Sequence, residues 1–429
     1  MSTPTAKQEW SAHWHLPFLG MLGIAGSATL GYSSGVFMQP ITEEFGWSRA
    51  QFSSAFTAQM LLALIVGPLV GRMIDRYGPR RVALVGVFAF MPGLSALGLA
   101  TGVPWQWWAL GALQSVCTAM IGPPTWISAI IPRFLASRGM ALAVALAGVG
   151  VATAIWPVAA AYFVEHIGWR ASFAAMALCW GALVVPLTFL FFTDPPRVAA
   201  PVVAGKPSSW EYRQALLSRD FICIALAGGL YASMSYAMIL HSVPILRENG
   251  LTLTQAATLA GVTGVFSITG RLCTGYLLDR FRTRPIAIVV FLVPIAVSLL
   301  LRSSGGSWET ALLAVMLLGL SAGAETDVVV YTASHRFGRH VFASVFAVIM
   351  AVFALFAAMG PLLASALFDA YQSYDLFLML VIPVIVVATI LIAVVLSPRP
   401  ARAAIMRHEQ ESHHLVSRSN SPTDQGEAI

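Results

Sequence analysis

Three charged side chains lie well inside long apolar runs of this 429-residue chain. Arg271 stands in the run 253–278, and Glu325 and Asp327 stand in the run 308–334. The planar guanidinium of an arginine matches the two oxygens of a carboxylate, and a carboxyl group in a poorly hydrated place takes up a proton more readily than an exposed one. These residue types could therefore bind an organic acid and carry a proton beside it.

The elements that must position these charges are membrane helices. Hydrophobic residues make up 58% of the chain and charged residues only 10%, whereas soluble domains carry about 25% charged residues. A spanning helix needs roughly 20 apolar residues. Twelve runs satisfy this: 16–38, 51–74, 82–101, 105–131, 139–164, 171–193, 221–246, 253–278, 285–303, 308–334, 341–366 and 373–396. The four cysteines fall inside such runs and are expected to be core residues rather than disulfides or metal ligands.

This pattern predicts an all-α integral membrane protein with twelve transmembrane helices in two pseudo-symmetric six-helix bundles, 16–193 and 221–396. The polar segment 194–220 would connect the bundles. Residues 1–15 would form a short tail and residues 397–429 a disordered one. Lys and Arg gather in the connections on one side, so we expect both termini in the cytoplasm, and the membrane to be the cell (inner) membrane.

A short motif occurs twice, half a chain apart. Residues 71–81 read G-R-M-I-D-R-Y-G-P-R-R, and residues 275–284 read G-Y-L-L-D-R-F-R-T-R. Asp75 and Asp279 are 204 positions apart, and the same offset relates the prolines at 157 and 361. Such a duplication in a hydrophobic chain predicts a transporter made of two similar halves.

The repeated loops have the residue types of a cytoplasmic gate. Small Gly71 and Gly275 would let neighbouring helices approach closely. Asp75 would accept hydrogen bonds from a helix N-terminus, or pair with an Arg of a facing loop, when the cytoplasmic side is closed. The alternative is that these charges only fix the topology. The candidate gating residues are Gly71, Asp75, Arg76, Gly78, Arg80, Gly275, Asp279 and Arg280.

The loop motif, the twelve runs and the central connection resemble the major facilitator superfamily over nearly the whole chain. The first copy departs from the usual motif at Pro79, where Arg is common, and the second copy has Arg282 where the first has Gly78. The resemblance implies two bundles that rock about a midplane cavity to expose it to each side in turn.

Two stretches narrow the resemblance to bacterial monocarboxylate and oxalate/formate-type transporters: G-Y-S-S-G-V-F-M-Q-P-I-T-E-E-F-G-W-S-R at 31–49 and S-I-T-G-R-L-C-T-G-Y-L-L-D-R at 267–280. Those families bind substrate with an arginine in helix 8, which is Arg271 here. The oxalate-type carriers also have a lysine in helix 11, but 341–366 has no Lys or Arg. Animal monocarboxylate carriers have a lysine where Tyr32 stands and an acid where Ser267 stands. One basic residue in the membrane favours a monoanion, carried into the cell with a proton.

Structural explanations exist for the same three charges. Arg271 could form a permanent pair with Glu325 or Asp327, or extend its side chain to the cytoplasmic surface. The two acids are two residues apart, about 200° around a helix, so at most one faces the cavity. Either acid could serve only as a structural charge partner.

Polar and aromatic residues in the other spans are weaker candidates for the substrate site. Tyr32 and Tyr236 could donate a hydrogen bond to a carboxylate, or be ordinary core tyrosines. His241 could titrate near neutral pH, or simply be wetted at the membrane interface. The remaining candidates could shape the pocket: Gln59, Gln114 and Trp126.

Other function classes find less support. The sequence has no P-loop, no Gly-x-Ser-x-Gly elbow and no His-Glu-x-x-His, so no enzyme activity, cofactor or metal is expected. The basic residues sit in short loops, which argues against nucleic acid. A proton-driven drug exporter of the same fold is the main alternative, and a non-transporting sensor is a weaker one. We expect a monomer whose partners are a small organic anion, protons and lipid.

Overall fold

The computed structural model describes residues 5–194, 209–337 and 339–397, and these residues form helices and short connections. The first half contains α1 (Ala6–His13), α2 (His15–Ser27), α3 (Thr29–Phe45), α4 (Arg49–Tyr77), α5 (Pro79–Ala96), a 3-10 turn (Leu97–Leu99), α6 (Pro104–Met120), α7 (Pro123–Ile130), α8 (Arg138–Leu146) and α9 (Gly148–Phe191). The second half contains α10 (Ser209–Leu216), α11 (Arg219–Leu240), α12 (Ser242–Glu248), α13 (Leu253–Arg280), α14 (Thr283–Ser303), α15 (Trp308–Arg336), α16 (Arg339–Tyr371) and α17 (Asp375–Val395).

The twelve predicted runs all fold as helices, some of them broken. Nine helices within the described residues are long and apolar enough to cross a membrane. One of these, Arg138–Phe191, contains two crossings, because Gly168 bends the chain with φ 76° and replaces a loop. Two further crossings are interrupted and so fall short in length: α2 with α3, which meet at Ala28, and α6 with α7. The fold is therefore the expected all-α membrane fold.

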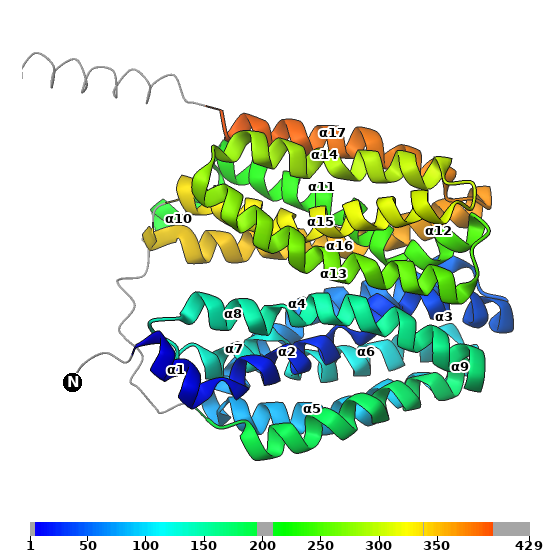
Figure 1. The fold of residues 1–429 in the computed structure, drawn as a ribbon, viewed down its shortest axis with the longest axis horizontal. Helices are drawn as coiled ribbons and strands as arrows, with labels where there is room; N and C mark the ends of the chain where they lie inside the picture. Colours follow the sequence, from blue (N-terminus) through cyan, green and yellow to red (C-terminus); the bar gives the residue numbers. More distant parts are fainter. Residues whose placement is uncertain (1–4, 195–208, 338, 398–429) are drawn as a thin grey trace, which may run out of the picture.

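The two halves lie side by side, with α1–α9 in one and α11–α17 in the other (Figure 1). We call the end of the molecule that carries α1, the α4–α5 turn and α10 the tail end, and the opposite end, which carries α12 and the bend of α9, the far end. Most of the expected connection between the halves, and nearly all of the expected C-terminal tail, lie outside the described residues.

One seam between the halves, which we call the glycine seam, is formed by α9 and α13. The two backbones touch: a Cβ added at Gly264 would lie 2.4 Å from both the Ala154 nitrogen and the Gly150 oxygen. A Cβ at Gly261 would lie 2.6 Å from the Ala154 oxygen. Glycine is required at these positions because any side chain would push the halves apart.

The second seam, which we call the polar seam, is formed by α4 and α16. The Thr57 hydroxyl donates to the Ala358 carbonyl at 2.8 Å, and the hydroxyls of Ser53 and Ser365 are 2.6 Å apart. Nearer the far end, Asp369 accepts hydrogen bonds from the first turn of α4. Apart from the contact between Tyr32 and Tyr236, the hydrogen bonds that join the halves between described residues lie toward the far end.

Candidate functional site

A cavity of about 120 Å³ lies between the halves and is lined by both of them. Its polar side chains are Tyr32, Thr153, Thr263, Ser267 and Arg271. The rest of its wall is mostly apolar or small: Ala143, Leu146, Ala147, Val149, Gly150, Ile239, Ile268, Leu272, Ala322 and Gly323. One cationic group in a largely apolar wall is suited to a small organic anion with an apolar body.

Arg271 is paired with Asp327, and the contact is loose. The Arg271 Nε lies 3.9 Å from the Asp327 Oδ1, and the two side chains are 36% and 29% exposed. A bidentate Arg–carboxylate pair has N–O distances of about 2.7–2.9 Å. The guanidinium therefore keeps donors for another carboxylate.

Close packing of α13 against α15 brings this pair together. A Cβ at Gly323 would lie 1.9 Å from the Ser267 oxygen, and one at Gly270 would lie 2.1 Å from the Leu320 oxygen. The backbones can approach so closely only because these positions are glycine. Arg271 and Asp327 follow directly after this contact, on facing helices.

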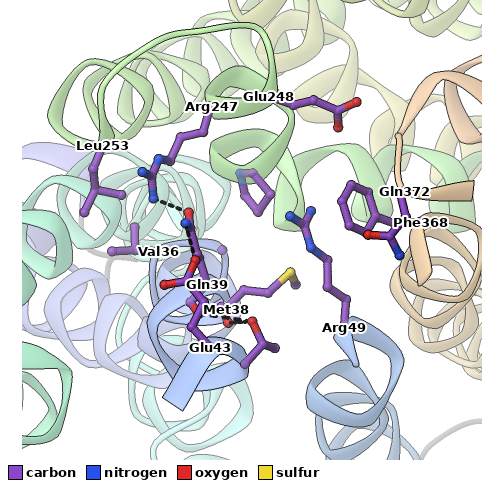
Figure 2. A pocket seen from close by; sticks show the side chains of 13 residues that line it. Val36, Met38, Gln39, Glu43, Arg49, Arg247, Glu248, Leu253, Phe368 and Gln372 are labelled. Carbon is purple, nitrogen blue, oxygen red and sulfur yellow. Dashed lines mark hydrogen bonds between the residues drawn. The ribbon is translucent and has the colours of Figure 1, made fainter. Parts of the chain in front are cut away.

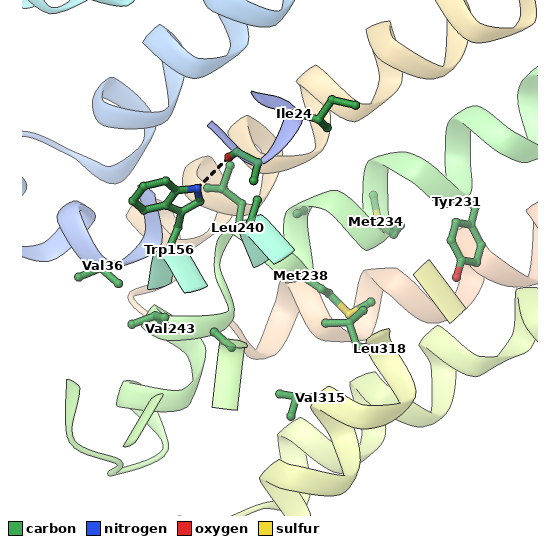
Figure 3. Close-up of a cluster of buried hydrophobic side chains, with 14 of the residues drawn as sticks. Ile24, Val36, Trp156, Tyr231, Met234, Met238, Leu240, Val243, Val315 and Leu318 are labelled. Atoms are coloured by element: carbon green, nitrogen blue, oxygen red, sulfur yellow. Dashed lines mark hydrogen bonds between the residues drawn. The ribbon is translucent and has the colours of Figure 1, made fainter. Parts of the chain in front are cut away.

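Glu325 lies elsewhere, inside the second half. Its side chain is 4% exposed, it does not line the cavity, and its Oε1 has no hydrogen-bond partner among the described residues. The neighbouring Tyr231 of α11 is fully buried, and its hydroxyl lies close to the side chains of Ser321 and Ser235. Tyr231 belongs to the apolar cluster shown in Figure 3. Of the two predicted acids, the structure thus pairs Asp327 with Arg271 and buries Glu325.

Tyr32 and Tyr236 meet across the halves. Tyr32 of α3 lines the cavity, and its side chain interacts with those of Thr153 and Tyr236. Both tyrosines are partly exposed. Nearby, the buried Trp156 donates its indole N–H to the Ala25 carbonyl at 2.8 Å (Figure 3). Tyr32 is therefore placed to donate to a bound anion, with Tyr236 beside it.

Three other predicted site residues lie in the core of the first half, away from the cavity lining. Trp126 is fully buried and donates to the Ile121 carbonyl at 2.7 Å. Gln114 is fully buried, and neither of its amide atoms has a partner among the described residues. Gln59 is partly exposed and donates to the Gly111 carbonyl at 3.2 Å. In this conformation none of the three reaches the cavity.

His241 is fully buried at the far end rather than wetted at an interface. Its Nδ1 lies 2.8 Å from the Tyr374 hydroxyl, and its Nε2 lies 3.1 Å from the Pro361 oxygen and 3.3 Å from the Ser365 hydroxyl. The alternative of a wetted histidine is wrong because α16 covers the ring, and His241, a predicted substrate-site residue, does not line the cavity that holds Arg271. His241 instead connects the polar seam to the helices beside it.

Arg49 lies at the centre of this far-end network. Its guanidinium donates to the Tyr374 hydroxyl at 2.7 Å and lies 3.4 Å from the centre of the Phe368 ring. It lines a cleft of about 380 Å³ between the halves, together with Arg247 (Figure 2). Arg247 donates to Gln39, so this cleft too is bridged by a bond between the halves.

Sequence reasoning missed this network, although the repeat offset carries a signal for it. Residues 46–51 read G-W-S-R-A-Q and residues 250–255 read G-L-T-L-T-Q, again 204 apart. Each stretch has a glycine with positive φ, then a Ser or Thr that caps a helix in a capping box with Gln. The repeated capping motif marks the first residues of α4 and α13, which are equivalent helices of the two halves.

The repeated loops lie at the tail end, where no hydrogen bond between described residues joins the halves. Asp75 and Arg76 are exposed, and nothing lies within 4 Å of a Cβ added at Gly71 or Gly275. Gly78 ends α4 with φ 86°. Arg80 stays within its own half, because its backbone N–H donates to Asp194 and its guanidinium to the Phe189 carbonyl.

In the second copy, the exposed Arg280 stacks on the Tyr276 ring at 4.7 Å. The side chain of Asp279 lies outside the described residues. The close approach expected at Gly71 and Gly275 is therefore not made in this conformation and stays a prediction for the state with a closed tail end.

Comparison with known proteins supports these observations. The model of the Major Facilitator Superfamily matches residues 20–355. An MFS-type transporter of Gibberella moniliformis is 27% identical over 63% of this chain and 63% of its own length, so the chain spans less than two thirds of it. The 3-(3-hydroxy-phenyl)propionate transporter of Escherichia coli is 27% identical over 77% of this chain and 81% of its own. Monocarboxylate transporter 13 of Bos taurus is 24% identical over 58% and 57%.

Solved structures agree with the fold. A bacterial homolog of the human lysosomal transporter Spinster, in an inward-facing and unoccupied conformation, superposes with a TM-score of 0.71 over 92% of this chain and 98% of its own, at 17% identity. The occupied inward-facing form of that homolog gives 0.65, over 92% of this chain and 96% of its own. At this identity the likeness is one of fold alone.

Proposed function

Because this chain belongs to the Major Facilitator Superfamily, and is thus a membrane transporter rather than an enzyme, we propose that it carries a small organic monocarboxylate by alternating access. The observation that carries the proposal is Arg271, a half-buried guanidinium in the central cavity with only a loose carboxylate partner. Relatives named as monocarboxylate and hydroxyphenylpropionate transporters support the same class of substrate.

The carboxylate of the substrate would replace Asp327 at Arg271. A bidentate pair with the guanidinium is stronger than the 3.9 Å contact that it displaces. Tyr32 would donate a further hydrogen bond from the first half, and the apolar wall around Ile268 would cover the body of the acid. Because one guanidinium faces the cavity, a monoanion is favoured over a dianion.

A proton would travel with the anion, on Asp327. Once the substrate occupies Arg271, Asp327 loses its cationic partner, and protonation removes the uncompensated charge from the cavity. The predicted mode is proton symport into the cell across the cytoplasmic membrane. Glu325 is the second candidate, because its buried Oε1 has no hydrogen-bond partner among the described residues, and an uncompensated charge there would be costly.

The structure would then represent the state that is open to the cytoplasm. The excess of Lys and Arg in the loops of the tail end assigns that end to the cytoplasm under the positive-inside rule. Hydrogen bonds join the halves at the far end, and none between described residues joins them at the tail end. Asp75 and its neighbours would form the latch when the tail end closes.

Ligand binding tests the substrate assignment. We expect aliphatic or aromatic monocarboxylates, but not their matched dicarboxylates or amides, to raise the melting temperature of the purified chain. Arg271→Ala should raise Kd roughly 10- to 100-fold, the loss of a charge-assisted bond. Arg302→Ala is the matched control, because Arg302 pairs with Asp375 outside the cavity. Equal binding by Arg271→Ala and wild type would overturn the assignment and favour a drug exporter.

Vesicle transport tests the proton. With Asp327→Asn we expect loss of uptake driven by a proton gradient, while exchange of labelled for unlabelled substrate continues. Glu325→Gln is the comparator and should keep gradient-driven uptake. The opposite outcome would assign the proton to Glu325, in the core of the second half.

A further inference from the structure

The N-terminus of α4 is completed by the other half of the molecule. The first backbone N–H groups of a helix have no partner within the helix. Ser48 accepts from the Gln51 amide within its own half. The two preceding amides, of Arg49 and Ala50, donate at 2.8 Å and 2.7 Å to the two carboxylate oxygens of Asp369 on α16. This end of α4 is therefore fully satisfied only while the far end is closed.

The charge of Asp369 adds to these bonds. A carboxylate at a helix N-terminus is stabilised by the helix dipole. The Arg49 side chain, in the same turn, lies on the ring of Phe368, the residue before Asp369 (Figure 2). It also donates to Tyr374 beyond the end of α16. The first turn of α4 thus binds the last turn of α16 through backbone, charge and ring contacts.

The helices α4 and α16 each carry an acid in the last turn. They run antiparallel, since Thr57 bonds to Ala358 while Arg49 bonds to Asp369. Asp75 stands in the last turn of α4, as Asp369 stands in the last turn of α16. Asp75 is exposed, and no ion pair within the described part of the chain includes it.

We propose that Asp369 is the latch of the far-end gate and works in opposition to Asp75. The Asp369 carboxylate binds the N-terminus of α4 when the far end is closed, in the way already expected of Asp75 when the tail end is closed, where α16 begins at Arg339. The helix pair α4–α16 then exchanges one capped N-terminus for the other in each transport cycle. The Asp75 half of this proposal rests on the proposed function, and the Asp369 half stands on the contacts above.

Distances between the halves test the proposal directly. Spin labels on Val103→Cys and Ser303→Cys report the far end, and labels on Leu135→Cys and Phe281→Cys report the tail end. All four positions are exposed, and the exposed Cys179 and Cys273 are first replaced by Ala. In wild-type protein without substrate, we expect a short far-end distance and a long tail-end distance to dominate.

Asp369→Asn should raise the ratio of far-end-open to far-end-closed molecules roughly tenfold, as expected for one lost charge-assisted bond. The far-end distance would lengthen and the tail-end distance would shorten together. Asp369→Glu keeps the charge and should restore most of the closed population. Asp375→Asn is the matched control, because Asp375 lies at the same end but pairs with Arg302 in its own half, so the ratio should stay within about twofold.

The opposition is tested by a double variant. Asp75→Asn alone should lower the small population with a closed tail end, and Asp369→Asn with Asp75→Asn should return the ratio toward wild type. Unchanged distances in Asp369→Asn, or an equal shift in Asp375→Asn, would overturn the latch. A double variant no closer to wild type than Asp369→Asn would overturn the opposition. Since no substrate is present, failure of the carboxylate assignment leaves these outcomes unaffected.

Discussion

The glycine seam and the polar seam occupy equivalent places in the two repeats and are built from different side chains. The offset of 204 residues that relates the halves pairs Thr57 with Gly261 and Ala358 with Ala154. In the polar seam the threonine hydroxyl donates to the Ala358 carbonyl. In the glycine seam the same position has no side chain, and the backbone itself approaches the Ala154 carbonyl.

A second equivalent pair differs in the same way. Ser53 and Ser365 bond to each other across the polar seam, and the offset relates them to Ala257 and Ala161, both buried. Directional bonds must break when helices separate, whereas contacts between small residues can slide and tilt with little change. Under the proposed alternating access, this difference predicts that the halves pivot at the glycine seam and are locked at the polar seam.

The largest effect is expected from Gly264→Ala, which would break the pivot. Its Cβ would lie 2.4 Å from backbone atoms of α9, and backbone cannot move aside as a side chain can. Overpacking of this kind costs about 1–3 kcal/mol. The melting temperature of the purified protein should fall and transport should slow in both directions. Gly139→Ala, where an added Cβ meets nothing within 4 Å, is the control, and a similar loss there would remove the pivot from the comparison.

A smaller effect is expected when the polar seam is given the residues of the other seam. Ser53→Ala with Ser365→Ala removes one hydrogen bond between the halves, worth about 0.6 kcal/mol in a membrane, and a longer contact from Ser365 to His241 within the second half. The population with an open far end should rise about threefold, read from the far-end label pair. Ser54→Ala is the control, since Ser54 bonds only to Gln51 and Trp108 of its own half. No rise would mean that the bond is not part of the lock.

The smallest effect on the balance between molecules with an open and a closed far end is expected from Glu9. Like Asp369, Glu9 accepts hydrogen bonds from backbone amides, but these amides lie in its own half. The amide of Ala136, the Ser137 hydroxyl and the Leu135 amide donate to Glu9 and hold its pKa at about 2. A lowered pKa means that the stabilisation is present above the ordinary value of a glutamate and is lost as pH falls toward 2.

The melting temperature of wild type should therefore exceed that of Glu9→Gln at pH 6, and the two curves should converge on acidification. The far-end distance should be the same in both proteins, because the tie does not cross between the halves. A change in this distance would show that Glu9 belongs to the gating contacts after all.

The sequence predicts the helices and the duplicated plan well, because apolar length and repeat offset are local properties. It also predicts that Arg271 could pair with Glu325 or Asp327. It cannot decide between Glu325 and Asp327, because that depends on the rotation of α15, which is set by the close packing at Gly323. The far-end network escaped prediction for a related reason, since Arg49 and Asp369 are 320 residues apart and meet only when the halves do.

The two ring nitrogens of His241 play different parts in hydrogen bonding, one as donor and one as acceptor. The Pro361 carbonyl can only accept, so the imidazole carries its hydrogen on Nε2 and presents a bare Nδ1 to Tyr374. Tyr374 must then donate to the ring and accept from Arg49. The three bonds form a single polarised chain from Arg49 through Tyr374 and His241 to Pro361, in which each donor strengthens the next. Of the three bonds, the one from Arg49 crosses between the halves. Its loss would weaken the bond that Tyr374 donates to Nδ1, so the Nδ1 shift of a labelled ring would record whether the far end is closed.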